Sequence, residues 1–517
     1  MGFLSLVALA LVLPWERQGN RFTLKLEDGR AEMDWVGASA FRFARDWSGR
    51  PFVNRPGGSD PVEVAAVATG ETAEFRTRHL TVEVRNRDLR LRVKDSQGVV
   101  LLEELAGARR EGAGIVLESS LAAGERVYGL GALALGPLDR RGAKIETPRP
   151  LFWSSAGYGR YFPSTDRHSV DLIADRCRVA VAGAARTEHY FYYGPSPKEI
   201  LEQHVVIAPQ VVSWATGDTQ VLRSDRLPEY AVRLPGGEAL AETVVRLNHA
   251  ALSGVQMPVF DLGAFTEAPE PLRRRAEQLA MVAPLVTAPA GAEALSRWRN
   301  RLRPYLYAYF QEAHDRGIPV LRPLAMQVPR EPAAAPHADL YHFGDELLAA
   351  PVLSAGGRRD VYLPMGIWTD LRDNRTYTGR RVIPIEAAPE ELPLFAKNGA
   401  VIPFLEGDRI EAHYFPKLGG EFFIFEPDIG EHTQLHASPA GDYYRFEIES
   451  RVDREYEWVA HHLPPPKAVM RGETSLPQVD SRDKLRPGTW FYDAAARNLH
   501  LRVTAPADAD IILNASF

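Results

Sequence analysis

The chain has 517 residues and a mass of 57.4 kDa, with 45% hydrophobic and 25% charged residues, which is an ordinary globular composition with room for several domains. A formal net charge of −6 gives no reason to expect a polyanionic ligand, so nucleic acid is disfavoured as a partner. The single cysteine, Cys177, excludes an internal disulfide framework and any metal site built from several thiolates.

An apolar run occupies residues 3–14 and is followed by the polar stretch 15–19. This run is too short to cross a bilayer as a helix, so we expect no membrane-spanning segment here. We interpret residues 1–19 as a signal peptide, which predicts a secreted or periplasmic protein. The alternatives are a misplaced start codon or a buried first strand, and a cytoplasmic location.

From residue 21 to about 209 the sequence is strand-like. Leu80, Val82 and Val84 alternate with polar residues, and the same period of two recurs over many short runs separated by turns. This pattern predicts a large antiparallel β-sandwich. The aromatic residues at 152–161 suit its core better than a sugar-stacking surface.

The middle of the chain changes character. Residues 238–252 have helical spacing, and 254–260 form a short apolar run that ends at Asp261 and Gly263. A helix, a strand, an acidic residue at the strand end and a glycine loop are typical of a β/α-barrel unit. Helices are then predicted over 270–282 and 293–315, the second with a kink at Pro304.

Strands are predicted to return from residue 318 onward. Breaks near Pro403 and Gly407 divide them into two C-terminal β units. The adjacent His461 and His462 would point to opposite faces of a strand, so we expect surface histidines there and no metal site.

Short motifs along the chain carry a resemblance to a known family. In the N-terminal part they are 127–131 (VYGLG), 138–142 (LDRRG), 154–159 (SSAGYG) and 192–200 (YYGPSPKEI). Further on they are 303–307 (RPYLY), 317–324 (GIPVLRPL), 350–353 (APVL), 361–364 (VYLP) and 399–403 (GAVIP). In order and spacing the chain resembles glycoside hydrolase family 31, the α-glucosidase and α-xylosidase group.

The resemblance leaves too little room for a complete catalytic barrel. Residues 214–217 (WATG) stand where the family barrel begins, and 261–265 (DLGAF) resemble a late strand motif. About 37 residues separate Gly217 from Gly254, whereas each β/α unit needs on the order of 30 and a full barrel roughly 250. We therefore predict a truncated barrel.

The family's chemistry depends on two carboxylates, and neither has a matching residue in this sequence. The resemblance implies that the nucleophile lies in the missing stretch and that Val232 stands at the acid/base position. Arg275, Gln278, Leu279 and Pro284 match the next family helix. In that register, the sugar-gripping Arg and His positions are taken by Thr287 and Pro289.

No catalytic residue is therefore assigned. Asp261, Trp214 and Phe265 are the candidate substrate-binding residues, and for Asp261 a purely structural role is an equal alternative. Asp218 follows Gly217 and imitates the acid/base motif, but its context favours a loop position. We expect no metal, because one cysteine and two adjacent histidines do not supply a ligand set. We expect no dinucleotide cofactor, because the 129–131 glycines lack the third glycine and following helix of a dinucleotide loop.

The predicted fold class is multidomain and mainly β. The ranges are a signal peptide at 1–19, a galactose-mutarotase-like β-sandwich at 20–210, a truncated β/α barrel at 211–315, and C-terminal β domains at 316–405 and 406–517. An incomplete barrel exposes sheet edges. We therefore expect the segment 218–250 to cover the edge, or the chain to associate there with itself or with another chain.

Two functions are consistent with these sequence features. The first is a catalytically inactive family member that binds oligosaccharide or serves in an assembly. The second is an active α-glycosidase whose carboxylates remain to be placed, with another chain completing the barrel. The loss of nucleophile, acid, Arg and His positions together favours the first.

Overall fold

The computed structural model describes residues 15–48, 52, 61–69, 71–131, 135–148, 150–209, 221–222, 239–289 and 292–517. The chain divides into two compact units. The first comprises residues 1–210 with 252–254 and 316–318; the second comprises 211–251, 255–315 and 319–517. Of the features predicted above, the apolar run up to residue 14, Trp214, Asp218 and Val232 lie outside the described residues.

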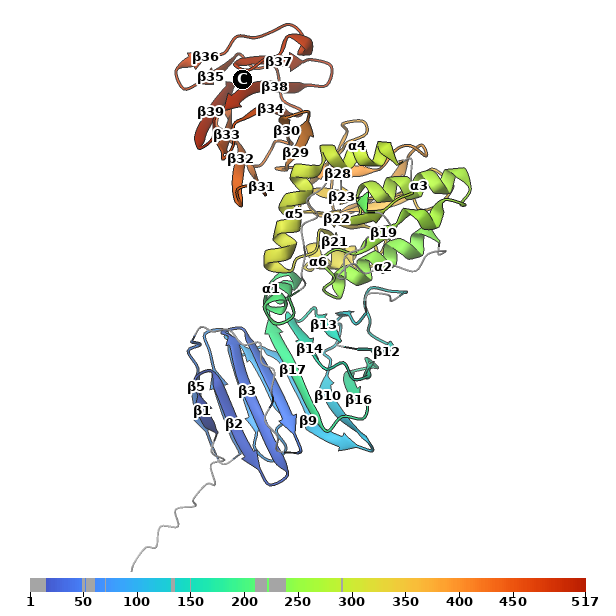
Figure 1. Ribbon diagram of the computed structural model, residues 1–517, viewed down its shortest axis with the longest axis vertical. Coiled ribbons are helices and arrows are strands. Elements are labelled where there is room, and N and C mark those ends of the chain that lie inside the picture. Colours follow the sequence, from blue (N-terminus) through green and yellow to red (C-terminus); the bar gives the residue numbers. More distant parts are fainter. Residues whose placement is uncertain are drawn as a thin grey trace, which may run out of the picture. The chain divides into compact units, whose positions relative to one another are not determined.

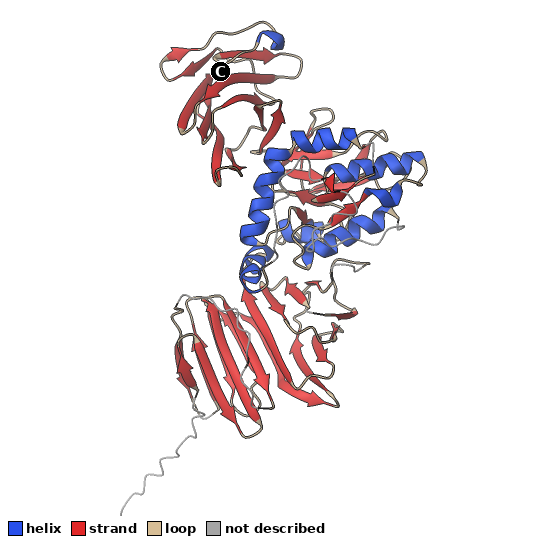
Figure 2. Cartoon of the chain, viewed as in Figure 1, coloured by secondary structure: helices blue, strands red, loops and turns tan. Residues whose placement is uncertain are grey.

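The described strands of the first unit form two mainly antiparallel sheets (Figures 1 and 2). One has the order β1 (Glu16–Gln18), β2 (Arg21–Leu26), β3 (Gly29–Gly37), β4 (Ala40–Asp46), β17 (Arg186–Tyr193), β14 (Tyr158–Tyr161), β13 (Leu151–Ser154), β11 (Val127–Gly129). The other has the order β12 (Lys144–Thr147), β15 (His168–Asp171), β16 (Arg176–Val181), β10 (Gly114–Ser120), β9 (Val100–Glu111), β8 (Leu91–Asp95), β7 (Leu80–Arg85), β6 (Thr72–Arg76), β5 (Ala65–Ala68). Helix α1 (Pro197–Ile207) begins at a Ser196 capping box.

The predicted alternation in this unit is confirmed. Leu80, Val82 and Val84 are buried along β7 while the residues between them are partly exposed. They share one core with Met33 and Trp35 of the other sheet. Most of the aromatic side chains at 152–161 are buried, as expected for core side chains.

The second unit begins with the mixed helical segment (Figure 2). Its described parallel strands have the order β18 (Val221–Leu222), β20 (Leu285–Thr287), β19 (Val259–Asp261). The helices are α2 (Leu240–Leu252), η1 (Leu262–Phe265), α3 (Glu270–Met281), α4 (Glu293–Arg301) and α5 (Arg303–Arg316). These described strands do not form a closed cylinder, and the truncated barrel stays a prediction.

The single kinked helix expected over 293–315 is wrong. The chain forms two helices, α4 and α5, that are separated at Leu302. Pro304 falls in the first turn of α5, where a missing backbone N–H costs no intrahelical hydrogen bond. Proline here starts a new helix, which is why no kink is needed. The strand expected at 254–260 is also shorter, beginning only at Val259.

The rest of the second unit is β structure. Its short helices here are α6 (Leu324–Gln327) and η2 (Pro332–Ala334). A first sheet has the order β21 (Leu321–Pro323), β22 (Tyr341–Phe343), β23 (Leu347–Ala349), β28 (Leu394–Lys397), β25 (Ile367–Asp370), β26 (Thr376–Thr378). A second sheet pairs β24 (Arg358–Leu363) with β27 (Arg381–Glu386). The last two are β29 (Val401–Glu406), β30 (Arg409–Tyr414), β34 (Arg454–Ala460), β38 (Asn498–Ala505), β37 (Thr489–Asp493); and β31 (Gly420–Glu426), β32 (Glu431–Ala440), β33 (Tyr443–Ser450), β39 (Ala509–Ser516), β35 (Ala468–Arg471), β36 (Thr474–Ser475). A short η3 (Arg482–Lys484) precedes β37.

The larger of two hydrophobic cores described in this unit links its helical segment to the later sheets. It includes Leu240 of α2, Val259 of β19, Tyr305 of α5, Val401 of β29 and Leu513 of β39. The protein is therefore multidomain and mainly β, and the individual boundaries at 315/316 and 405/406 stay predictions. Among the described helices, none has both the length and the apolar composition needed to cross a membrane.

Candidate functional site

The carboxyl ends of the parallel strands β19 and β20 bring two polar side chains together. The strands pair in register, with Val259 opposite Leu285, and this places Asp261 opposite Thr287. The apolar residues of both strands are buried, so the sheet fixes the two strand ends. In β/α barrels this end of the sheet carries the active site.

Thr287 holds Asp261 by a hydrogen bond. The Thr287 hydroxyl, on a residue that is 1% exposed, donates to Asp261 Oδ1 at 2.5 Å. A hydrogen bond to an ionised acceptor is stronger than one between neutral groups. In the register implied by the family resemblance, Thr287 stands at an arginine position, so a neutral hydroxyl replaces a cation beside this carboxylate.

Phe265, the second candidate substrate-binding residue, does not present an open surface at the strand ends. Phe265 is 5% exposed, and its ring packs against Phe260 at a centroid distance of 5.7 Å. This contact places Phe265 in the core, while Trp214 lies outside the described residues. A sugar-contacting role for Asp261, Trp214 and Phe265 stays a prediction.

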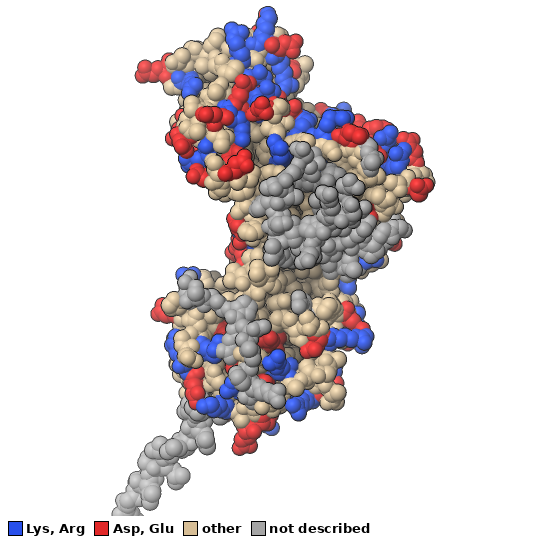
Figure 3. All heavy atoms as spheres, in the orientation of Figure 1, with Lys and Arg blue, Asp and Glu red and all other residues tan. Residues whose placement is uncertain are grey.

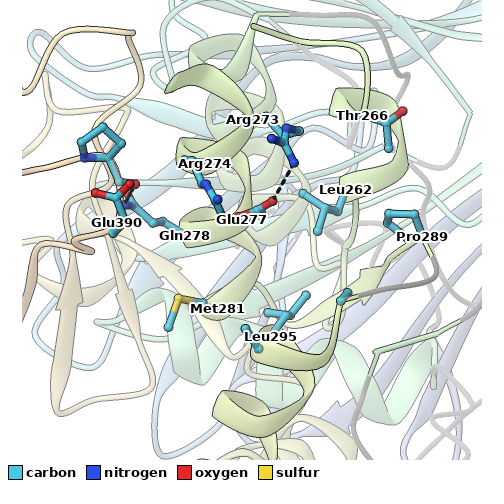
Figure 4. A pocket seen from close by; sticks show the side chains of 13 residues that line it. Leu262, Thr266, Arg273, Arg274, Glu277, Gln278, Met281, Pro289, Leu295 and Glu390 are labelled. Atoms are coloured by element: carbon cyan, nitrogen blue, oxygen red, sulfur yellow. Dashed lines mark hydrogen bonds and ion pairs between the residues drawn. The ribbon is translucent and has the colours of Figure 1, made fainter. Parts of the chain in front are cut away.

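A pocket of about 590 Å³ adjoins the strand ends (Figure 4). Leu262 and Thr266, which follow Asp261 along the chain, form part of its wall. The volume is within the range of small-molecule sites, roughly 300 to 1,000 Å³. The lining residues are Leu262, Thr266, Arg273, Arg274, Glu277, Gln278, Met281, Pro289, Ala292, Ala294, Leu295, Pro389 and Glu390.

Helix α3 supplies the polar wall of this pocket. Arg274 donates to Glu270 and Glu277 at 3.1 Å each, and these hydrogen bonds raise the pKa of Arg274. Arg273 Nη1 lies 3.7 Å from Glu277 Oε1 (Figure 4). Residues spaced by three or four along a helix share a face, which is why these groups line one wall.

Sequence reasoning missed most of the pocket. It placed Pro289 near the site, but it treated α3 only as a family-matching helix. The signal available was the charged run at 273–277, with two arginines before a glutamate at helical spacing. The two further walls, Leu295 of α4 and the 389–390 segment, come from other parts of the chain.

Paired carboxylates are missing from the described strand ends. A retaining glycosidase places two carboxyl groups about 5 to 5.5 Å apart across the scissile bond. At the carboxyl ends of β19 and β20, Asp261 is the one carboxylate among the residues that the structure describes. With the Thr287 hydroxyl bonded to Asp261, this end of the sheet offers one acid and one hydroxyl.

His461 packs among aromatic and histidine side chains. In the described part of the chain, no group of three or more His, Cys, Asp or Glu residues is arranged to hold a metal ion. The surface position expected for His461 is wrong, because it is 8% exposed. It stacks on Phe415 with ring centroids 4.4 Å apart, and its Nε2 is 3.0 Å from His413 Nδ1.

The surface charge is mixed. On the face shown in Figure 3, Lys and Arg side chains alternate with Asp and Glu side chains over the described residues. Such a surface presents no continuous basic area on that face for a polyanion.

Fold and site together define a class: a mainly β, multidomain protein with parallel strands and helices in its middle and a pocket beside the strand ends. Residues 317–402 match the family profile described as the glycosyl hydrolase family 31 C-terminal domain. A 1,6-alpha-glucosyltransferase from Sporosarcina globispora is 37% identical over 121 residues, which is 23% of this chain and 9% of that protein. Alpha-glucosidase 2 from Bacillus thermoamyloliquefaciens is 31% identical over 163 residues, 30% of this chain and 20% of that protein.

Solved structures share the fold. A family 31 dextranase from Flavobacterium johnsoniae, solved with isomaltotriose, superposes with a TM-score of 0.80 at 15% identity, covering 98% of this chain and 99% of that one. The family 31 profile and the curated relatives support membership of glycoside hydrolase family 31, as the motif order predicted, and the solved structure shows a shared fold. The sequence matches cover at most a fifth of the length of these two curated relatives.

Proposed function

We propose that this protein is a noncatalytic member of glycoside hydrolase family 31 that binds a neutral α-linked oligosaccharide in the pocket beside β19 and β20. The observation that carries the proposal is that Asp261 is a single carboxylate at the described strand ends and is hydrogen-bonded to Thr287. It accepts from Thr287, and the described strand ends offer no second carboxylate for a glycosidic oxygen. A retaining glycosidase needs two positioned carboxyl groups, one as the nucleophile and one as the general acid.

The pocket chemistry favours a polyhydroxyl ligand. Its planar polar groups supply both donors and acceptors, from Arg273, Arg274, Glu277 and Glu390, and the two positive charges balance the two negative ones. An array of this kind can bind neighbouring hydroxyls without favouring an ion. The apolar side chains beside them, such as Leu262, suit the hydrocarbon face of a sugar ring.

The choice of sugar comes from the relatives. One is named a 1,6-alpha-glucosyltransferase, and the dextranase was solved with isomaltotriose. We therefore propose α-linked gluco-oligosaccharides as ligands, with isomaltotriose as the first probe and maltotriose as the second.

Calorimetric titration with both probes tests binding. Arg274→Ala removes donors from the pocket wall and should weaken binding about tenfold, which corresponds to roughly 1.4 kcal/mol. Arg297→Ala, an exposed arginine on α4 outside the pocket lining, is the control and should bind like the unmodified protein. If Arg274→Ala bound the probes with unchanged affinity, the ligand would not bind in this pocket.

An aryl α-glucoside and an aryl α-xyloside test catalysis. The unmodified protein should show no turnover above that of the Asp261→Asn and Asp218→Asn variants. Turnover that either substitution abolishes would contradict the noncatalytic assignment and support an active α-glycosidase.

A further inference from the structure

The third wall of the pocket is a loop between β27 and β28, residues 387–391. Pro389 and Glu390 of this loop line the pocket, and Figure 4 shows Glu390 beside Gln278 at the end opposite Pro289. Within the loop, the Ala388 amide donates to the carboxylate of Glu391 at 2.9 Å. The loop connects two strands of the chain, whereas α3 and α4 supply helical walls.

Two buried side chains of α3 fasten this loop. Arg275 is 0% exposed, and its guanidinium donates to the carbonyl oxygens of Ala387 and Ala388 at 2.6 Å each. Gln278 is 3% exposed, and its Nε2 donates to the carbonyl oxygen of Pro389. Three consecutive loop carbonyls are thus held by two residues one helical turn apart.

Arg275 does more than fill space. A buried guanidinium whose terminal nitrogens donate to neutral carbonyls keeps a desolvated charge, which costs more free energy than an apolar side chain at the same position. Burial lowers the pKa of Arg275, and the carboxylates of Glu390 and Glu391 oppose this change. Glu390 therefore lies within the electrostatic range of the same guanidinium that holds its loop.

We propose that Arg275 and Gln278 are positioning residues that hold the 387–391 loop, and that Glu390 on this loop determines which oligosaccharide the pocket selects. The inference rests on the proposed function and deepens it. A carboxylate binds two neighbouring hydroxyls only when it is fixed to within about 0.5 Å, which a free loop would not achieve. Arg275 acts through Glu390 and touches no ligand.

A double-mutant cycle tests the coupling, with isomaltotriose and maltotriose as probes. Glu390→Ala should weaken binding of the preferred probe about tenfold and bring the two dissociation constants closer together. In an Arg275→Met background, Glu390→Ala should change affinity less than about twofold, because the loop no longer presents the carboxylate. If Arg275 had a merely structural role, Glu390→Ala would raise the dissociation constant by the same factor in both backgrounds. That result would overturn the proposal.

Two controls separate loop positioning from loss of folding. Glu386→Ala removes an exposed carboxylate that pairs with Arg358 at the end of β27, outside the pocket lining, and should leave both affinities unchanged. Arg275→Lys keeps a donor and a charge and should restore part of the affinity lost in Arg275→Met.

Amide hydrogen exchange gives a readout without ligand. In Arg275→Met the amides of Ala388 and Glu391 should exchange about tenfold faster than in the unmodified protein. Unchanged exchange would contradict the proposal that Arg275 holds the 387–391 loop. If the unmodified protein binds probe and Arg274→Ala weakens it while Glu390→Ala does not, the proposed function stands and this inference falls. If neither probe binds the unmodified protein, both fall.

Discussion

At the scale of single residues, the contact between Thr287 and Asp261 decides the chemistry of the strand ends. A hydroxyl that donates to a carboxylate fixes the orientation of that carboxylate. Thr287 is nearly fully buried, so its hydroxyl contributes to stability as well as to orientation. The family resemblance implies an arginine that grips sugar hydroxyls at this position, and this chain has Thr287 there.

Replacing Thr287 by Val tests this contact. Valine has nearly the same shape but no hydroxyl, so Asp261 Oδ1 loses a donor, and the free energy of unfolding should fall by about 1 to 3 kcal/mol. Thr287→Ser keeps the hydroxyl and is the matched control, expected to lose less than Thr287→Val. Urea unfolding monitored by fluorescence measures both. Equal loss in the two variants would mean that packing, not the hydrogen bond, matters at this position.

At the scale of elements, α4 closes the carboxyl end of α3. Arg299 is 1% exposed and donates to the carbonyl oxygens of Ala280, Ala283 and Pro284 at 3.2, 2.7 and 2.8 Å. A cation at the end of a helix satisfies carbonyls that have no intrahelical partner. This contact fixes the turn that leads from α3 into β20, and therefore the position of Thr287.

Arg299→Met should lower the free energy of unfolding by about 2 to 4 kcal/mol, because it leaves buried carbonyls without donors. Arg297→Met on the same helix is exposed and should change stability by less than about 0.5 kcal/mol. Chemical denaturation of both variants measures the difference. If Arg299→Met were as stable as Arg297→Met, the hydrogen bonds from Arg299 to the carbonyls at the end of α3 would contribute nothing to stability.

At the scale of the whole molecule, α5 connects the helical segment of the second unit to its later sheets. The ring of Tyr305 stacks on Phe422 of β31 at 5.4 Å, and its hydroxyl donates to the carbonyl of Phe343 in β22. Tyr309 donates to Glu346 Oε2 at 2.5 Å, and the Tyr305 hydroxyl oxygen lies 3.0 Å from the same carboxylate oxygen. One helix face thus contacts two sheets and a carboxylate, which explains how the larger core of this unit extends from the helical segment into the later sheets.

Glu346 makes this junction sensitive to pH. Burial, followed by the neighbouring charge of Asp345, raises the pKa of Glu346 to about 7, although Tyr309, Tyr305 and Arg322 act against the shift. A folded-state pKa above the ordinary 4.5 means that the folded protein binds this proton more tightly than the unfolded chain. The contribution of Glu346 to stability is therefore fully present below pH 4.5 and is lost as the pH rises to about 7.

Glu346→Gln should remove this slope, because the amide stays neutral at every pH. Between about pH 5 and pH 8 the unmodified protein should lose about 2 kcal/mol more stability than Glu346→Gln. Urea unfolding at a series of pH values measures the two curves, and Glu386→Gln, which changes an exposed carboxylate, should follow the unmodified protein. Parallel curves for Glu346→Gln and the unmodified protein would contradict the assignment.

Local sequence patterns were sufficient for much of the fold. Alternation at Leu80, Val82 and Val84 predicted a strand, and motif order predicted the family. They failed at Pro304, where the same local signal fits a kink or a new helix, and only packing decides which forms. They failed again at His461, because a strand pattern does not reveal which ring will cover a side chain.

The sequence by itself determined the mainly β class and the place of Asp261 at a strand end, because each follows from residues close together along the chain. It also indicated the family, through the order of short motifs. Only the tertiary structure decided what Asp261 contacts and what surrounds the pocket. Thr287 lies 26 positions from Asp261, and Ala387 lies 112 positions from the guanidinium that holds it. Hydrogen bonds require atoms within about 3 Å, and the packing of strands, helices and loops sets that distance.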